Sequence, residues 1–186
     1  MVGVRPSPIE GTITSALTSA WPGRWFGTRI PARERPAEFA RVTATRRLSL
    51  AEWASARAAA MTRIDGSMVA LRRASELGVV SLLSNNPAAT ASALPILAPD
   101  VVEILGRNQL FSYMLGARKP GEEIYRRALA HYGVDAADAF LADDSLANVE
   151  GARSVGMTAF QLLRVDGQFQ TDALLAAVET FAARSR

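Results

Sequence analysis

The chain has 186 residues, of which 49% are hydrophobic and 21% charged, with a formal net charge of +3. This length and composition suit one globular domain with a sizeable core and a small appendage. The sequence contains no cysteine, which excludes disulfides, thiolate metal sites and a cysteine nucleophile; this fits a reducing compartment, and we expect a cytoplasmic protein. No run of about 18 apolar residues occurs, so no membrane span or membrane partner is predicted.

Positive charge is concentrated towards the N-terminus. Residues 1–64 hold ten Arg and four Glu, a net charge of +6, and residues 65–186 hold eleven basic and fourteen acidic residues, a net charge of −3. Basic and aromatic residues mix in the first segment, which is one feature of nucleic-acid contact. Since no compact Arg run appears, we interpret this segment as a solvated arm and do not expect nucleic acid as the partner.

The first 64 residues show few regular elements. Prolines and glycines interrupt residues 1–36, where residues 2–4 are a candidate short strand. Ser49 and Glu52 form a capping box ahead of an Ala-rich helix that runs to about residue 61. We therefore predict a basic N-terminal arm and a reduced helical cap over 1–64, which could include a degenerate first strand.

From residue 65 onward, helices and strands alternate. A helix from Asp65 or Ser67 is stopped by Gly78, and a strand at 79–83 follows. Asn86 is the expected N-cap of the next helix, with Pro87 in its first turn. The later elements are a weak strand at 111–115, a helix opened by Pro120 and ended by Gly133, a strand at 139–142, a helix capped by the Ser145 hydroxyl and stopped near Gly156, a strand at 158–163 and a helix at 171–183.

This alternation predicts an α/β fold, with a Rossmann-like, mostly parallel sheet and flanking helices over 65–186. The pattern leaves open whether residues 2–9 fill the centre of the sheet or whether the centre is empty. An empty position would expose strand edges, and we would then expect a homodimer.

Polar side chains follow three of the predicted strands. Ser84 ends one strand, Lys119 follows the next, and Asp143 and Asp144 end a third. Carboxyl ends of parallel strands meet at one edge of a sheet. A hydroxyl donor, an ammonium and a carboxylate pair that suits Mg²⁺ form a set for handling phosphate. Lys119 is the only lysine in a chain with twenty arginines, which indicates a position that needs a compact point charge.

These polar residues lie in three longer segments, which are Leu82-Leu83-Ser84-Asn85, Gly116-Ala117-Arg118-Lys119-Pro120 and Asp143-Asp144-Ser145-Leu146-Ala147-Asn148-Val149-Glu150-Gly151-Ala152. In order and spacing, the three segments resemble motifs of the haloacid dehalogenase-like hydrolases, and the resemblance covers about residues 62–165. The Asp-Asp-Ser form of the last motif resembles the phosphatase branch, which includes sugar-phosphate phosphatases; true dehalogenases usually carry a less acidic motif.

The resemblance implies a role for each matching residue. Ser84, Asn85 and Lys119 would bind the phosphoryl group, and Lys119 would also pair with the nucleophile. Asp144 would be the main Mg²⁺ ligand, supported by Asp143, and Asn148 would help to order the loop. Taken singly, Ser84 could be a strand-end cap and Lys119 a surface charge, but the ordered set favours the site.

The first motif of that family, Asp-x-Asp, is missing, because no Asp precedes Asp65. The segment that comes nearest to this motif is Pro8-Ile9-Glu10-Gly11-Thr12-Ile13. It has Pro8 at the position of the nucleophile and Glu10 at the position of the general acid and base. Proline has no nucleophilic group, so the carboxylate that would form the covalent intermediate is absent.

Two functions remain open at this stage. The first is a Mg²⁺-dependent phosphatase for a small phosphate ester, with weak or absent turnover. The second is a non-catalytic scaffold that binds phosphate, metal or a partner.

Overall fold

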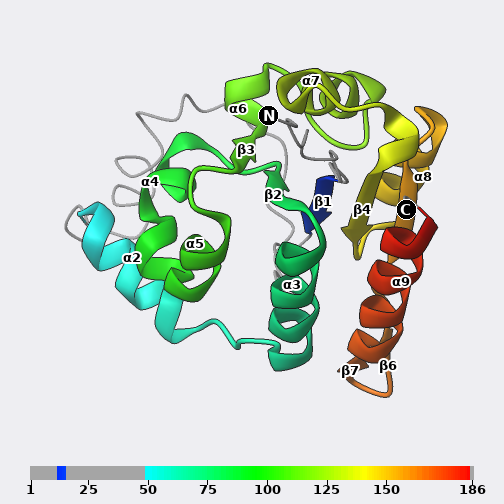
Figure 1. Ribbon diagram of the computed structural model, residues 1–186. Coiled ribbons are helices and arrows are strands. Elements are labelled where there is room, and N and C mark those ends of the chain that lie inside the picture. The colour runs from blue at the N-terminus through cyan, green and yellow to red at the C-terminus, as the bar shows by residue number, and fades with distance from the viewer. Residues whose placement is uncertain (1–11, 16–48, 185–186) are drawn as a thin grey trace, which may run out of the picture.

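The computed structural model describes residues 12–15 and 49–184, and a five-stranded parallel sheet lies at its centre. The strand order is β3-β2-β1-β4-β5 (Figure 1). This confirms the predicted α/β fold with a Rossmann-like parallel sheet. The strands are β1 (Thr12–Ser15), β2 (Val79–Ser84), β3 (Gln109–Phe111), β4 (Ala139–Asp143) and β5 (Thr158–Gln161).

The middle of the sheet is filled by β1, which pairs with β2 on one side and β4 on the other. The hypothesis of an empty centre is therefore wrong, and the strand that fills it is Thr12–Ser15, not residues 2–9. The argument for a homodimer from an empty centre falls with it, and dimerisation stays a prediction. Residues 2–4, the candidate strand, lie outside the described residues.

Helices cover both faces of the sheet because side chains along each strand alternate. Phe140 and Ala142 of β4 pack on one face, and Ala139 and Leu141 pack on the other. The first face is covered by α3 (Asp65–Leu77), α4 (Ala88–Leu97), α5 (Pro99–Leu105) and α9 (Thr171–Arg184), and the second by α7 (Glu122–Tyr132) and α8 (Leu146–Ser154).

α3 and α9 lie side by side over the sheet (Figure 1).

The sequence of α7 accounts for which side of the helix is buried and for where the helix ends. Ile124 and Ala128, four residues apart, are buried against the sheet, and Gly133 ends the helix in the left-handed conformation, with φ of 65°.

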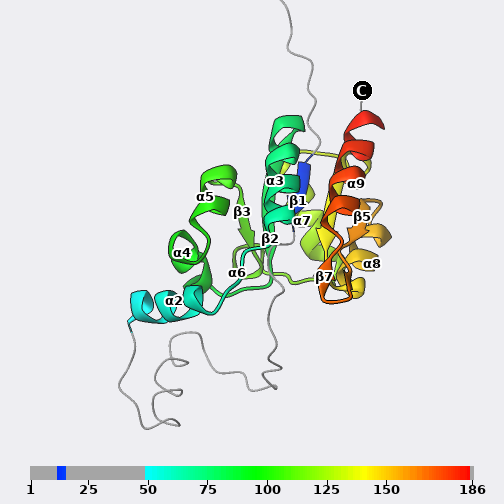
Figure 2. The ribbon, with the colours of Figure 1, turned by 90° about the horizontal axis from the view of Figure 1, so that it is seen from below.

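α2 (Leu50–Ala59) lies away from the sheet, packed on α4, at the end of the molecule opposite α8 and α9 (Figure 2). Both halves of the predicted capping box are present, since Ser49 Oγ accepts from the Glu52 backbone N–H and the Glu52 carboxylate accepts from that of Ser49. A small apolar cluster of Ala54, Ala93 and Leu97 joins the two helices.

Several predicted boundaries are wrong. The expected strand at 111–115 divides into β3 and a short helix, α6 (Ser112–Leu115). Pro87, not Asn86, is the N-cap of α4, and α7 has Gly121 as its N-cap, so Pro120 lies before it. Between β5 and α9 the chain forms a small antiparallel hairpin that the sequence reading missed, β6 (Arg164–Val165) and β7 (Gln168–Phe169).

Within residues 12–15 and 49–184, no single helix is long and apolar enough to cross a membrane. In this part of the chain, α4 and α5 together do reach that length and composition, but they are bent by 103° at their junction. Both contribute buried residues to the core, among them Leu94 and Val101.

Candidate phosphate and metal site

The site lies where β2 and β4 end, on either side of the central strand. Ser15, the last residue of β1, pairs with Leu82 of β2 and with Ala142 of β4. Ser84 is two residues beyond Leu82, and Asp143 is one residue beyond Ala142. The register therefore brings these two predicted site residues to the same edge of the sheet.

Lys119 and Asp143 form a buried ion pair. Lys119 Nζ lies 2.6 Å from Asp143 Oδ2, and the two residues are 3% and 2% exposed. The alternative that Lys119 is a surface charge is therefore wrong. Each charge would be costly to bury alone, so the pair ties the loop that carries Lys119 to the end of β4.

The other oxygen of Asp143 caps α8. Oδ1 accepts hydrogen bonds from the Ser145 backbone N–H and from Asn148 Nδ2, each at 2.9 Å. The prediction that the Ser145 hydroxyl caps this helix is wrong, because Ser145 occupies the N-cap position without making a side-chain cap. The carboxylate also suits the positive end of the helix dipole. Asp143 thus accepts three hydrogen bonds, and about one of its lone-pair positions remains.

Asp144 presents the opposite case. Its side chain is half-buried, and among the described residues its carboxylate has no hydrogen-bond or ion-pair partner. Its backbone carbonyl accepts from Gln161 Nε2 at 3.2 Å, which holds the backbone in place. A carboxylate without a partner among the described residues, on the residue that follows Asp143, fits Mg²⁺, which binds one or two protein carboxylates and completes its shell with water and phosphate oxygens. Across residues 12–15 and 49–184, no group of three or more His, Cys, Asp or Glu side chains gathers, so the donor set is small.

Ser84 is fully buried at the end of β2. Its Oγ accepts a hydrogen bond of 2.7 Å from Asn86 Nδ2. Because a hydroxyl can accept and donate at once, this contact orients the oxygen and leaves its hydrogen available for a phosphoryl oxygen.

Asn85, the next residue, binds the backbone of Lys119. Asn85 Nδ2 donates to the Lys119 carbonyl oxygen, and the Lys119 N–H donates to Asn85 Oδ1, each at 2.8 Å. The sequence predicts Asn85 as a phosphate-binding residue and does not predict this contact with Lys119. No local pattern indicates it, since the two residues are 34 apart in the chain.

Tyr125 supports the site through Asn148, and the sequence does not predict this role. The ring is fully buried, and its OH donates to the Asn148 carbonyl oxygen at 2.7 Å. Burial raises the pKa of the Tyr125 phenol well above its ordinary value, and the nearby Asp143 charge raises it further. Tyr125 is therefore a neutral donor that holds Asn148 against Asp143.

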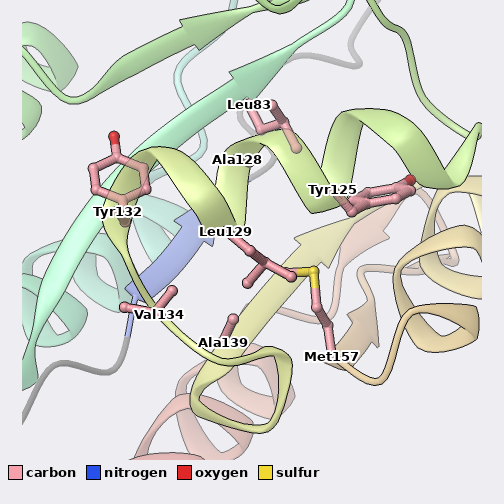
Figure 3. Close-up of a pocket in the computed structure, with 8 residues that line it drawn as sticks. All are labelled: Leu83, Tyr125, Ala128, Leu129, Tyr132, Val134, Ala139 and Met157. Carbon is pink, nitrogen blue, oxygen red and sulfur yellow. The ribbon is translucent and has the colours of Figure 1, made fainter.

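A separate cavity lies between α7 and the sheet, with Tyr125 in its lining (Figure 3). Tyr125 and Tyr132 stand at opposite ends of α7 beside it, and Tyr132 OH bonds Ser81 Oγ at 2.8 Å. Its lining residues carry no charged group, so it lacks the chemistry for phosphate. They are Leu83, Tyr125, Ala128, Leu129, Tyr132, Val134, Ala139 and Met157.

The structure thus brings together Lys119 and Asp143 directly, and Asn85 through the Lys119 backbone. Ser84 is the last residue of β2, and Asp144 directly follows β4. Glu10, predicted as a replacement acid and base, lies outside the described residues.

Fold and site together define an α/β protein whose strand ends carry a hydroxyl, an ammonium and a carboxylate pair. The model of the haloacid dehalogenase-like hydrolase family matches residues 9–156. The chain therefore belongs to this family. The comparison with curated proteins finds no match.

Solved structures show the same fold. A HAD phosphatase from Thermococcus onnurineus is similar with a TM-score of 0.56 and 21% identity, over 70% of this chain and 60% of that chain. A HAD family enzyme from Bacteroides thetaiotaomicron, with an aspartate replaced by alanine and in complex with magnesium and inorganic phosphate, has a TM-score of 0.54 and 22% identity, over 69% of this chain and 70% of its own. An uncharacterized protein from Corynebacterium glutamicum has 25% identity and a TM-score of 0.50, over 62% of this chain and 80% of its own.

Proposed function

We propose that this chain binds Mg²⁺ and a small phosphate ester at the carboxyl edge of its sheet, with weak or absent phosphatase turnover. The observation that carries the proposal is the division of labour between the two adjacent aspartates. Asp143 is committed to Lys119, Ser145 and Asn148, whereas the Asp144 carboxylate has no partner among the described residues.

The charges favour joint binding of metal and phosphate. Lys119 and Asp143 balance each other, so Asp144 leaves the group with one net negative charge. A phosphate ester is itself an anion and would be repelled by that charge. Asp144, with the spare position on Asp143, would hold Mg²⁺, which offsets negative charge on the phosphoryl group when bound. The Ser84 hydroxyl would donate to a phosphoryl oxygen.

The missing carboxylate argues for slow turnover. No Asp precedes Asp65, and Lys119 is already paired with Asp143. Joint binding of metal and phosphate has support from the Bacteroides thetaiotaomicron enzyme, which is in complex with magnesium and inorganic phosphate when one of its aspartates is replaced by alanine. The non-catalytic scaffold is the second candidate, and the absence of that Asp is the observation that favours it.

The test measures phosphate release from a panel of small phosphate esters with and without Mg²⁺, beside calorimetric titration of Mg²⁺. We expect Mg²⁺ binding that is lost in Asp144→Asn, and turnover that is slow and Mg²⁺-dependent. Turnover that is abolished by Glu10→Gln would make Glu10 the replacement acid and base. Binding with no turnover would establish the scaffold. Wild-type protein that binds neither Mg²⁺ nor phosphate would refute the proposal.

A further inference from the structure

We infer that Asn85 is a positioning residue, which fixes the Lys119 ammonium against Asp143 by holding the Lys119 backbone, and that it does not itself bind the phosphate. This inference deepens the proposed function, and the part that concerns phosphate binding rests on that proposal. The geometric part, that Asn85 fixes the position of Lys119, does not depend on it.

The first support is how the Asn85 side chain is used. Its carbonyl oxygen and one of its N–H groups are both engaged with the backbone of one residue, at 2.8 Å in each direction. This pair of hydrogen bonds resembles those that a residue makes with a neighbouring β-strand. It fixes both the position and the orientation of the Lys119 peptide groups. Only one N–H is left for any other partner.

The second support is where the Lys119 ammonium has to go. A lysine side chain has four rotatable bonds, and holding it in one conformation costs considerable entropy. Lys119 Nζ reaches Asp143 Oδ2 at 2.6 Å with its side chain 2% exposed, so the backbone that carries it must be fixed. The Asn85 amide supplies that anchor on the side of β2, and Asp143 supplies the other on β4.

The third support is the contrast with Asn86. Asn86 Nδ2 donates to Ser84 Oγ at 2.7 Å and makes no hydrogen bond with Lys119. The two consecutive asparagines therefore serve different site groups: Asn85 orients the ammonium and Asn86 orients the hydroxyl. This gives a neighbouring control of the same residue type, half-buried like Asn85.

The sequence supplies an unusually direct probe, because Lys119 is the only lysine in the chain. Its ε-amine can be acylated with a succinimidyl ester, and peptide mapping by mass spectrometry separates that product from acylation at the N-terminus. The rate reports how often Nζ leaves Asp143 and meets solvent, without any need for activity, metal or phosphate.

We expect Asn85→Ala to be acylated at Lys119 about tenfold faster than wild type, since two hydrogen bonds to the backbone are lost. Asn85→Asp keeps the acceptor for the Lys119 N–H and loses the donor to the carbonyl oxygen, so it should give an intermediate rate and covers the case in which the alanine variant fails to fold. Asn86→Ala should stay within about twofold of wild type, as it removes a bond elsewhere.

A wild-type acylation rate in both Asn85 variants would overturn the inference. So would an equal increase in Asn86→Ala, which would indicate general loosening of the loop. Titration with inorganic phosphate and Mg²⁺ then tests the other half. If Asn85 acts through Lys119, then Asn85→Ala should weaken phosphate binding in the wild-type background and add nothing in a Lys119→Met background. An additive loss would mean that Asn85 contacts phosphate directly. Failure of wild type to bind phosphate would count against the proposed function alone and leave the acylation result standing.

Discussion

Lys119 Nζ and Asp143 Oδ2 lie 2.6 Å apart in a part of the molecule that solvent barely reaches. The two residues come from the loop before α7 and from the end of β4, so their contact joins segments that the sheet alone does not connect. Asn85 holds the first segment and Asn148 the second. The ion pair is therefore the centre of a hydrogen-bonded network among the described residues, and Lys119 balances the charge on Asp143.

The first prediction concerns stability. Lys119→Met leaves the Asp143 carboxylate buried without its cation, and we expect the free energy of unfolding to fall by about 3–5 kcal/mol. The double variant Lys119→Met, Asp143→Asn removes both charges and should lose less than the sum of the single variants. Urea denaturation measures all three.

The exposed pair Arg126–Glu122 on α7, with 2.5 Å between Nη2 and Oε2, is the control. Arg126→Met should cost less than about 1 kcal/mol, because solvent screens this pair. If Lys119→Met cost no more than Arg126→Met, the buried pair would have no special weight in the fold.

The second prediction separates the two adjacent aspartates. Asp144→Asn should weaken Mg²⁺ binding at least about tenfold, which corresponds to roughly 1.4 kcal/mol. It should leave the melting temperature nearly unchanged, since its carboxylate has no partner among the described residues. Asp143→Asn should lower the melting temperature strongly. Calorimetric titration and thermal unfolding of the same samples measure the two effects. If Asp143 were the main ligand, Asp143→Asn would lose more Mg²⁺ affinity than Asp144→Asn.

The convergence of Ser84 and Asp143 could be predicted, because each ends an apolar strand and parallel strands bring their carboxyl ends to one edge. Lys119 follows the short helix α6, so the strand ends alone do not place its side chain. The partner of each residue could not be predicted in the same way. Asn85 meets Lys119 across 34 positions, and the strand pairing that brings them together has no local signal.

The errors have similar causes. Either Asp143 or Ser145 could cap α8 by its residue type, and the contact with Lys119 orients Asp143 so that its second oxygen takes the cap. Apolar residues at 111–115 suit a strand or a buried helix turn, because a short apolar run has no clear period. The structure ends the strand at Phe111 and continues as α6.

The third prediction concerns pH. Burial raises the pKa of Tyr125, so the folded state keeps the phenol protonated at a pH where the unfolded chain, with a pKa of about 10, releases its proton. The stability that depends on this proton is present below about pH 10 and is lost as the pH rises towards the folded-state value. Urea unfolding between about pH 8 and 11 should therefore show a fall that is less steep in Tyr125→Phe than in wild type.

At neutral pH the same variant should lose about 1 kcal/mol, because it gives up the hydrogen bond to the Asn148 carbonyl oxygen. Tyr132→Phe should flatten the alkaline fall in the same direction, since burial also raises the Tyr132 pKa, while the hydrogen bond with Ser81 lowers it. If the free energy of unfolding fell with pH as steeply in both variants as in wild type, the raised pKa values of the two tyrosines would be contradicted.

The fourth prediction tests how closely α8 approaches the Lys119 loop. A Cβ added at Gly151 would lie 2.3 Å from the Pro120 carbonyl oxygen and 3.0 Å from Tyr125 Cε2. In an open helix, Gly→Ala stabilises by roughly 1 kcal/mol. Here the nearest atom is backbone and cannot turn aside, so Gly151→Ala should instead destabilise by about 1–3 kcal/mol.

Because Pro120 follows Lys119 directly, the same substitution should disturb the ion pair. Acylation of the single lysine should speed up in Gly151→Ala, whereas Glu150→Ala, at an exposed neighbouring position of α8, should match wild type in both acylation and stability. A stabilised Gly151→Ala protein would show that α8 can move away from the loop at little cost. A destabilised variant with unchanged acylation would show that α8 bears the strain and that the Asn85 amide still holds Lys119 in place.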